Sequence, residues 1–264
     1  MTDDEKGFTV DGKLVTFSQC ADYKDVEQYK EGKVDMIMEC TGKFLKVKEL
    51  DEYFTDLGVK RVVVSAPVKE EGALNVVLGC NHELLTEEMK LVTNASCTTN
   101  CFVPMVQVLD DAFGVEKGLM TTVHAYTGDQ SLVDGPHGDL RRARASAINI
   151  IPTSTGAARA TGLVLQAMNG KLDGISLRVP IPDGSITDFT ALLNSAPSVD
   201  EINAAFKDAA SSGALANVLE YSDRPLVSSD IVGNPASCVF DSGLTMTMDN
   251  LVKISGWYDN EWGY

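Results

Sequence analysis

Apolar runs of strand length alternate with helix-type segments through the first third of the chain, and this alternation restricts the fold more than any other feature. An apolar stripe through Leu50 and Phe54 predicts a helix that ends at Gly58, and "HELLTEEM" predicts a shorter helix. Buried strands separated by helices predict a parallel sheet covered on both faces. The expected strands are Val34–Glu39, "KRVVVSAP", "NVVLGC" and "KLVTN", preceded by a hairpin in "FTVDGKLVTF" that turns at Asp11-Gly12.

The pattern changes near residue 96, where we place a domain boundary. The spacing of Cys101, Met105, Leu109 and Phe113 predicts a helix that begins at Cys97. Further helices are expected in "STGAARATGLVLQAM", ended by Gly170, and in "SVDEINAAF", which opens with a Ser-x-x-Glu capping box.

Strands dominate the rest of this second region. A loop with few apolar residues, Thr127–Arg144, interrupts them, and Leu244, Met246 and Met248 alternate with threonines as in a half-exposed antiparallel strand. The second region therefore predicts an α+β domain with an antiparallel sheet. Its expected strands are "GLMTTVHAY", "GISLRVPIP", "SITDFTALLN", "SCVFD", "GLTMTMD" and "LVKISGW".

Composition excludes several classes of function. The net charge of -16 disfavours a nucleic-acid partner, and no apolar run approaches the roughly 18 residues of a membrane span. The acidic start "MTDDEKGF" lacks the features of a secretory signal, so we expect a cytoplasmic protein. The six cysteines form no C-x-x-C pair and are expected to be mostly small buried residues, and the three histidines do not suggest a metal site.

Ligands of parallel sheets bind at the carboxyl ends of the strands. In the first region these ends are Thr41-Gly42, Ser65-Ala66 and Ser96-Cys97. Cys97 follows a strand and begins a helix, a position that can lower the pKa of a thiol, so either a catalytic thiolate or a buried structural cysteine fits. Cys101, one turn later on the apolar stripe, fits a structural role better.

A cysteine nucleophile needs a base, and His124 in a downstream strand is the best placed of the three histidines, although a structural histidine is also compatible with the pattern. His82 and His137 fit ordinary structural roles. Thr155 and Gly156 open a helix, where free N–H groups attract phosphate, and Ser96 and Thr98 add hydroxyls beside Cys97.

Two arginine features point to anions as well. Arg178 lies in an apolar strand, where an arginine needs an ion pair or a bound anion. Capping of a helix explains Thr155 and Gly156 equally well, and a salt bridge explains Arg178. Arg141, Arg142 and Arg144 form a basic cluster that fits an anion contact, a subunit contact or an ion-paired surface.

Five motifs in order resemble the phosphorylating glyceraldehyde-3-phosphate dehydrogenases over nearly the whole chain. They are "NASCTTNC" (94–101), "MTTVHAYTGDQ" (120–130), "NIIPTSTGAA" (149–158), "LRVPIP" (177–182) and "WYDNEWGY" (257–264). The resemblance implies a partial Rossmann-like domain over 1–96, a catalytic domain over 97–249, and a segment over 250–264 that returns toward the cofactor.

The resemblance also implies roles for individual residues. Cys97 would be the nucleophile and His124 its activator. One phosphate site would use Ser96, Thr98, Thr155 and Gly156, and the other would use Thr127 and Arg178. Asn260 would orient the nicotinamide of NAD or NADP, and the cofactor cleft would be lined by Thr41, Gly42, Ser65 and Ala66.

The implied reaction is the oxidation and phosphorylation of glyceraldehyde 3-phosphate to 1,3-bisphosphoglycerate through a Cys97 thioester, in a homotetramer to which the arginine-bearing loop contributes a subunit contact. Family members open with a strand and a glycine-rich turn, which this sequence lacks, and they continue beyond the position of Tyr264. We therefore expect a chain truncated at both ends that binds dinucleotide poorly. Gly128 also replaces a common asparagine.

Three other functions are compatible with the sequence. An erythrose-4-phosphate dehydrogenase would share the superfamily and the same motifs. A thiol or redox module that has lost cofactor binding would keep the reactive cysteine. A cysteine hydrolase would use the Cys–His pair, but it leaves the two anion sites and "YDNEWGY" without a role.

Overall fold

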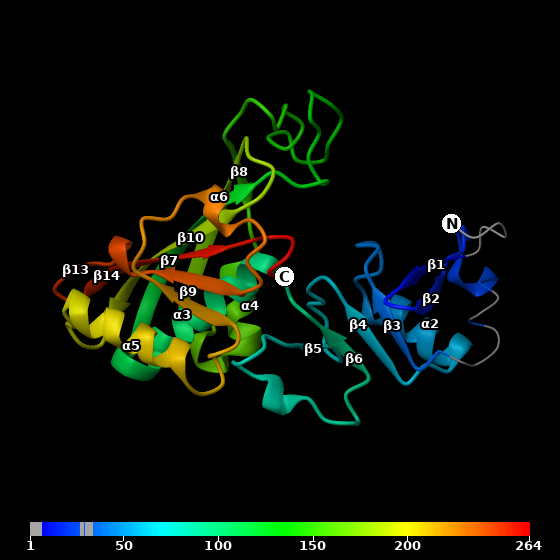
Figure 1. The fold of residues 1–264 in the computed structure, drawn as a ribbon, viewed down its shortest axis with the longest axis horizontal. Helices are drawn as coiled ribbons and strands as arrows, with labels where there is room; N and C mark the ends of the chain where they lie inside the picture. The colour runs from blue at the N-terminus through cyan, green and yellow to red at the C-terminus, as the bar shows by residue number, and fades with distance from the viewer. Residues whose placement is uncertain (1–6, 27–28, 30–33) are drawn as a thin grey trace.

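The computed structural model describes residues 7–26, 29 and 34–264, and these residues form three sheets (Figure 1). The predicted hairpin is confirmed: β1 (Gly7–Val10) pairs antiparallel with β2 (Lys13–Thr16). Asp11 and Gly12 both have positive φ, the conformation that a two-residue hairpin turn requires. A single 3₁₀ turn, η1 (Tyr23–Asp25), follows the hairpin.

The second sheet has four strands, all parallel, in the order β3-β4-β6-β5. Helix α2 (Val47–Leu57) buries Leu50 and Tyr53 against it and ends at Gly58, whose φ of 65° is left-handed. The predicted parallel sheet and this helix are therefore confirmed. The strands are β3 (Met36–Glu39), β4 (Arg61–Val64), β5 (Leu74–Asn75) and β6 (Leu91–Thr93).

Two predictions for this sheet are wrong. "NVVLGC" is mostly a turn, because the side chain of Asn81 accepts a hydrogen bond from the N–H of Val77 and donates one to the carbonyl of Asn75. "HELLTEEM" forms only one 3₁₀ turn, η2 (His82–Leu84). The polar side chain thus replaces the backbone pairing that a longer strand would make.

The sheet is covered on both faces at β6, where three consecutive residues are buried, but not at β3. Along β3, Ile37 and Glu39 are buried on the side of α2, whereas Met36 and Met38 are exposed. β3 is an edge strand, and its alternation shows that a helix covers one face of it.

The third sheet holds eight strands in the order β11-β12-β14-β10-β7-β9-β8, with β13 paired to β14. Most neighbours are antiparallel, as predicted, but β7 with β9 and β11 with β12 are parallel. The strands are β7 (Val115–Ala125), β8 (Ile151–Ser154), β9 (Leu172–Val179), β10 (Ser185–Leu193), β11 (Leu219–Ser222), β12 (Cys238–Asp241), β13 (Met246–Met248) and β14 (Leu251–Tyr258).

Three helices bury the main core against this sheet. α3 (Cys97–Phe113) contacts β7, β10, β12 and β14, α4 (Ala157–Val164) packs on α3 and β9, and α5 (Val199–Ser211) packs on α3 and β11. The predicted start at Cys97 and the capping box between Ser198 and Glu201 are confirmed. Two short elements, α6 (Ser228–Ile231) and the 3₁₀ turn η4 (Ser242–Leu244), complete the region.

The helix predicted to run to Gly170 breaks earlier. α4 ends at Val164, Leu165 is extended, and a separate 3₁₀ turn, η3 (Gln166–Met168), follows. A Cβ on Gly162 would lie 3.0 Å from the Cα of Asn169, so the chain folds back onto the helix at a position where only glycine leaves room.

Side-chain exposure departs from the sequence pattern in two further places. β13 pairs antiparallel with β14 as expected, but Met246 and Met248 face outward while Thr245 is buried and donates a hydrogen bond to Asn203. The expectation that most cysteines are buried is wrong. All six are free, and only Cys101 and Cys238 are fully buried.

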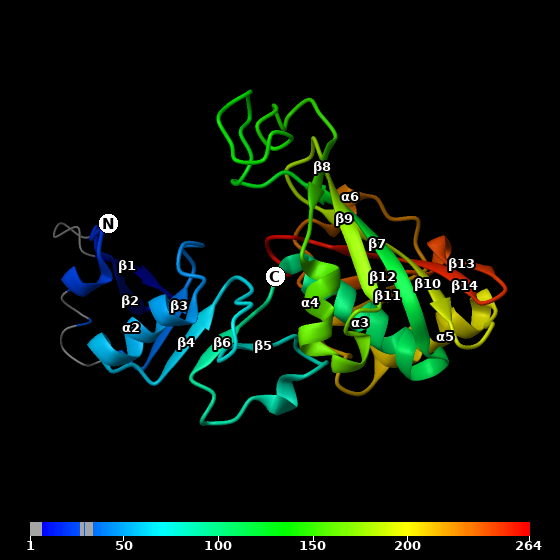
Figure 2. The ribbon, with the colours of Figure 1, turned by 180° about the vertical axis from the view of Figure 1, so that it is seen from behind.

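The arrangement in space brings the end of the chain between the two larger sheets (Figures 1 and 2). The segment after β6 crosses from the parallel sheet into α3, and the long loop before β8 projects away from the eight-stranded sheet. None of the helices in the described part of the chain combines the length and the apolar character that a membrane crossing requires.

Candidate active site

A tight turn places Cys97 as the first residue of α3. Ala95 has a left-handed φ of 52°, and Ser96 caps the helix by accepting a hydrogen bond from the N–H of Thr99. The amide of Asn100 donates to the carbonyls of Asn94 at 2.7 Å and of Ser96 at 3.0 Å. The turn is therefore held from both sides, and Asn100 is a supporting residue that the sequence did not single out.

The structure brings Cys97 and His124 together. The Sγ of Cys97 lies 3.4 Å from the Nε2 of His124, which is buried near the end of β7. The Nδ1 of His124 lies 2.6 Å from the carbonyl oxygen of Ala125 and 3.0 Å from the Nη1 of Arg178. Because the shorter contact requires a donor on the ring, we assign the ring proton to Nδ1. Nε2 is then free to accept the Cys97 proton, which is the geometry of a nucleophile and its base.

The electrostatics of the pair differ from the expectation that the helix N-terminus lowers the thiol pKa. Burial raises the pKa of the Cys97 thiol, although hydrogen bonds from Thr98 and the charge of Arg178 oppose that shift. Burial, followed by the charge of Arg178, lowers the pKa of His124 to about 4. Both shifts favour a neutral thiol hydrogen-bonded to a neutral imidazole at pH 7.

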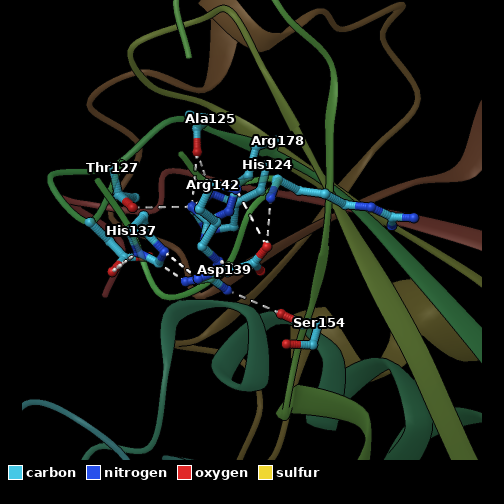
Figure 3. Close-up of polar contacts among 10 residues, drawn as sticks. His124, Ala125, Thr127, His137, Asp139, Arg142, Ser154 and Arg178 are labelled. Carbon is cyan, nitrogen blue, oxygen red and sulfur yellow. Dashed lines mark hydrogen bonds and ion pairs between the residues drawn. The ribbon is translucent and has the colours of Figure 1, made fainter. Parts of the chain in front are cut away.

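Arg178 and Thr127 also meet beside His124 (Figure 3). Arg178 lies opposite His124 in the pairing of β9 with β7, and its Nη1 donates to the carbonyl of Ala125 at 3.1 Å and to the hydroxyl of Thr127 at 3.3 Å. Its Nε is buried without a partner, and no carboxylate within the described residues forms an ion pair with it. These contacts favour a bound anion over the salt bridge that the sequence left open.

Thr155 and Gly156 line a cavity of about 370 Å³ at the start of α4. Ser96 and Thr98, expected at the same phosphate site, do not line it. The hydroxyl of Ser96 lies 2.7 Å from that of Thr99, and the hydroxyl of Thr98 lies 2.8 Å from that of Tyr258. The structure therefore places two of the four predicted residues in one cavity, and the other two at the N-terminus of α3.

Tyr258 is a further residue that the sequence analysis did not select. It is fully buried, its hydroxyl bridges Thr98 and Thr122 at 2.8 Å each, and its ring stands edge-on to His124 at 5.9 Å. A buried tyrosine needs a partner for its hydroxyl, so its occurrence in the apolar "LVKISGWY" could have signalled a polar cluster.

The basic cluster of the long loop is largely ion-paired. Arg142 pairs with Asp129 and lies 3.6 Å from Asp139, and Arg144 pairs with Asp134. Arg142 also donates to the carbonyl of Ser154, which ties the loop to β8 (Figure 3). Within the described part of the chain, these contacts support the interpretation of the cluster as an ion-paired surface.

The predicted cofactor-lining residues follow the ends of the parallel strands. Thr41 and Gly42 follow β3, and both the N–H and the hydroxyl of Thr41 donate to the buried carboxylate of Glu39. Ser65 and Ala66 follow β4, where the N–H of Ser65 donates to the carbonyl of Glu39. These four residues therefore lie along one edge of the sheet.

Asn260, from the other end of the chain, lies against the start of β10 in the eight-stranded sheet. Its Oδ1 accepts from the hydroxyl of Ser185 at 2.7 Å, which leaves its buried Nδ2 without a partner. Nearby, Asn94 donates to the carbonyl of Tyr264 at 3.1 Å, and the hydroxyl of Tyr264 donates to the carbonyl of Ala95. A buried amide donor without an acceptor fits a ligand that carries a carbonyl, such as a carboxamide.

No group of three or more histidine, cysteine, aspartate or glutamate side chains is arranged to hold a metal ion among the residues that the structure describes. A parallel sheet is followed by a mixed sheet, and the Cys97–His124 pair lies where the second region begins. This arrangement is that of an enzyme with a thiol nucleophile.

Comparison with known proteins identifies the family. The family described as "Glyceraldehyde 3-phosphate dehydrogenase, C-terminal domain" matches residues 96–260. A glyceraldehyde-3-phosphate dehydrogenase of Mycobacterium bovis is 56% identical over 231 residues, which cover 88% of this chain and 67% of that protein. One from Streptomyces coelicolor is 52% identical over 262 residues, covering 98% and 77%. The chain belongs to the glyceraldehyde-3-phosphate dehydrogenase family of oxidoreductases.

Proposed function

We propose that this chain catalyses the oxidation and phosphorylation of glyceraldehyde 3-phosphate to 1,3-bisphosphoglycerate with NAD or NADP, as a step of glycolysis. The observation that carries the proposal is the approach of Cys97 to His124 at 3.4 Å. Arg178, which has no ion-pair partner among the described residues, lies on the Nδ1 side of the imidazole. The relatives named glyceraldehyde-3-phosphate dehydrogenase support the reaction and its substrate.

His124 begins the reaction by accepting the Cys97 proton at Nε2, and the sulfur then attacks the aldehyde carbon. The backbone N–H of Cys97, at the N-terminus of α3, faces the oxygen that becomes negatively charged. Arg178 and Thr127 hold the phosphate group of the substrate. Because the charge of Arg178 is one cause of the low His124 pKa, a dianion bound there raises the affinity of His124 for the proton.

The second half of the reaction releases the product. Inorganic phosphate, held by Thr155 and Gly156 at the start of α4, attacks the carbonyl carbon of the Cys97 thioester. The C–S bond breaks, the sulfur leaves as a thiolate, and protonated His124 returns its proton to it. Ser96 and Thr98 contribute by fixing the helix start, since their hydroxyls are bonded to Thr99 and Tyr258.

The residues present fit the nicotinamide half of a dinucleotide cofactor. The buried Nδ2 of Asn260 lacks an acceptor, and the carboxamide of the nicotinamide would supply one. Thr41, Gly42, Ser65 and Ala66 would line the cleft at the strand ends. When bound, NAD or NADP would accept the hydride whose loss converts the aldehyde adduct of Cys97 into the thioester.

The domain organisation and assembly belong to the same proposal. We assign 1–96 to cofactor binding, 97–249 to catalysis and 250–264 to the return toward the cofactor. Within 250–264, β14 belongs to the eight-stranded sheet, between β12 and β10, so only 259–264 is left to reach the cofactor. A homotetramer and a cytoplasmic location are proposed on the family alone.

Replacement of the two cysteines of α3 tests the function. Cys97→Ser should lower phosphate-dependent aldehyde oxidation by roughly 10³-fold or more, because a hydroxyl is a far weaker nucleophile, whereas Cys101→Ser should change it by less than about threefold. The assay follows cofactor reduction with glyceraldehyde 3-phosphate. Oxidation that survives in Cys97→Ser would refute the proposal, and hydrolysis of esters without cofactor would revive the cysteine hydrolase.

A further inference from the structure

Lys69 projects into the cavity that Thr155 and Gly156 line. Its Nζ lies 3.7 Å, and its Cε 3.9 Å, from the position that a Cβ on Gly156 would occupy. Lys69 comes from the loop between β4 and β5, in the parallel-sheet region, and faces α4 of the catalytic region. The cavity is therefore lined from two parts of the chain: Lys69 from the parallel-sheet region, and residues of β8 and α4 from the catalytic region.

The backbone that carries Lys69 is anchored on both sides. Val68 is fully buried in the core under α2, and its carbonyl accepts a hydrogen bond from the buried amide of Asn75 at 2.8 Å. Glu70 uses its carboxylate to accept from the N–H of Val47 at 2.7 Å, at the start of α2. The backbone position of Lys69 is thus fixed by the contacts of Val68 and Glu70. The carboxylate of Glu70, which is adjacent in sequence, is bonded to the start of α2 and not to Lys69.

The charge of Lys69 is uncompensated within the described residues. Two cations line the cavity, and Arg159 forms a two-point ion pair with Asp173 at 3.2 Å, whereas no ion pair joins Lys69 to a carboxylate. In a chain of net charge -16, a cation that lines a cavity and has no ion-pair partner among the described residues is available for an anion.

The remaining groups suit a tetrahedral oxyanion. The hydroxyl oxygen of Thr155 accepts from the N–H of Ala157 at 3.2 Å, so its proton is free to be donated into the cavity. Gly156 leaves the space that a side chain would fill. A donor on one wall and an ammonium group on the other match an anion with oxygens on several sides.

We propose that Lys69 binds the attacking inorganic phosphate, opposite Thr155 and Gly156. This inference rests on the proposed function and adds a residue from the cofactor-side region to its second anion site. Binding of phosphate then joins the two regions, because one ligand is held by the loop after β4 and by the start of α4.

The test measures phosphate binding and phosphate kinetics separately. In the full chain, Lys69→Met should raise the Kd of inorganic phosphate about 10-fold, read by calorimetry or ³¹P NMR, and the KM for phosphate by the same factor. The KM for the aldehyde should stay within about twofold, because that substrate uses Arg178. Lys69→Arg should remain within about threefold of the parent chain, since it keeps the charge.

Lys48→Met is the matched control, since Lys48 is exposed on α2 outside the cavity. Equal phosphate affinity in Lys69→Met and Lys48→Met would overturn the inference while leaving the proposed function intact. If the parent chain itself oxidises the aldehyde without any dependence on phosphate, the proposed function fails instead. A large rise in aldehyde KM in Lys69→Met would also overturn the inference, because the lysine would then act on the site as a whole.

Discussion

The two anion-binding regions hold their positive charge in opposite ways. Arg178 is largely buried in the catalytic sheet and is fixed by the carbonyl of Ala125 and the hydroxyl of Thr127. Lys69 is exposed, comes from the other region of the chain, and touches no carboxylate among the described residues. A buried, fixed arginine recognises a group by geometry and acts on His124, whereas an open lysine attracts an ion that must enter and leave in every cycle.

Among variants of the two anion-binding regions, the largest expected effect comes from removing the buried cation, Arg178. Arg178→Ala should raise the KM for glyceraldehyde 3-phosphate by roughly 100-fold, because charge-assisted hydrogen bonds to the substrate phosphate are lost. The KM for inorganic phosphate should change by less than about threefold. Steady-state kinetics with each substrate varied in turn checks both numbers.

Arg144→Ala is the control, since Arg144 is an exposed arginine paired with Asp134. If Arg178→Ala raises both KM values equally, the two anion-binding regions do not act separately, and the distinction drawn between Arg178 and Lys69 is wrong. The same variant should raise the pKa of His124, because the charge that helps to lower it is gone.

The second prediction concerns acid stability. His124 has a pKa of about 4 in the folded protein, below the ordinary value of 6.5, so between these values the unfolded chain binds a proton that the native chain does not. Stability is therefore lost as pH falls from 6.5 toward 4, at about 1.4 kcal/mol per pH unit from this group. The free energy of unfolding should decrease by about 2 kcal/mol more between pH 6.5 and pH 5 in the parent chain than in His124→Asn.

Urea unfolding at the two pH values measures this difference. Arg178→Ala should lie between the parent chain and His124→Asn, since it removes the second cause of the low pKa but not burial. A parent chain that loses less stability than His124→Asn on acidification would mean that the pair exists as thiolate and imidazolium, and the neutral assignment would be wrong.

The smallest expected effect comes from a substitution in the cavity that Lys69 and Gly156 line. Gly156→Ala places a methyl group 3.7 Å from the Nζ of Lys69, in the space left for the anion, and should raise the KM for phosphate by about fivefold. The φ of Gly156 is -90°, so alanine adopts it without strain and stability should hold. Gly138→Ala, which meets nothing within 4 Å, is the matched control. An unchanged phosphate KM in Gly156→Ala would remove the cavity from the mechanism.

Sequence patterns predicted the buried anion-binding region around Arg178 better than the exposed one around Lys69. Cys97, His124 and Arg178 stand out because a polar or ionisable residue in an apolar strand or at a helix start needs a reason, and the structure brings all three together. Lys69 could not be singled out, because one lysine in a polar loop looks like any other until tertiary structure places it beside Gly156.

The fold shows the same limit. Parallel pairing, the start of α3 and the capping box of α5 follow from local patterns, and they are confirmed. Exposure of Met36 and Met38, the turn made by Asn81 and the early end of α4 depend on which neighbour each segment meets. Local sequence does not carry that information. Likewise, the hydroxyls of Ser96 and Thr98 could not be assigned before their partners Thr99 and Tyr258 were placed.

The central position of β14 has a consequence for how the site comes into being. Among the described residues β14 is the last strand in sequence, but it lies between β12 and β10, and the hydroxyl of its Tyr258 is bonded to Thr98, which is 160 residues away. Contacts this distant in sequence are slow to form. During synthesis Cys97 would leave the ribosome well before Tyr258. The contacts that Tyr258 makes around the thiol therefore cannot form until β14 has been synthesised.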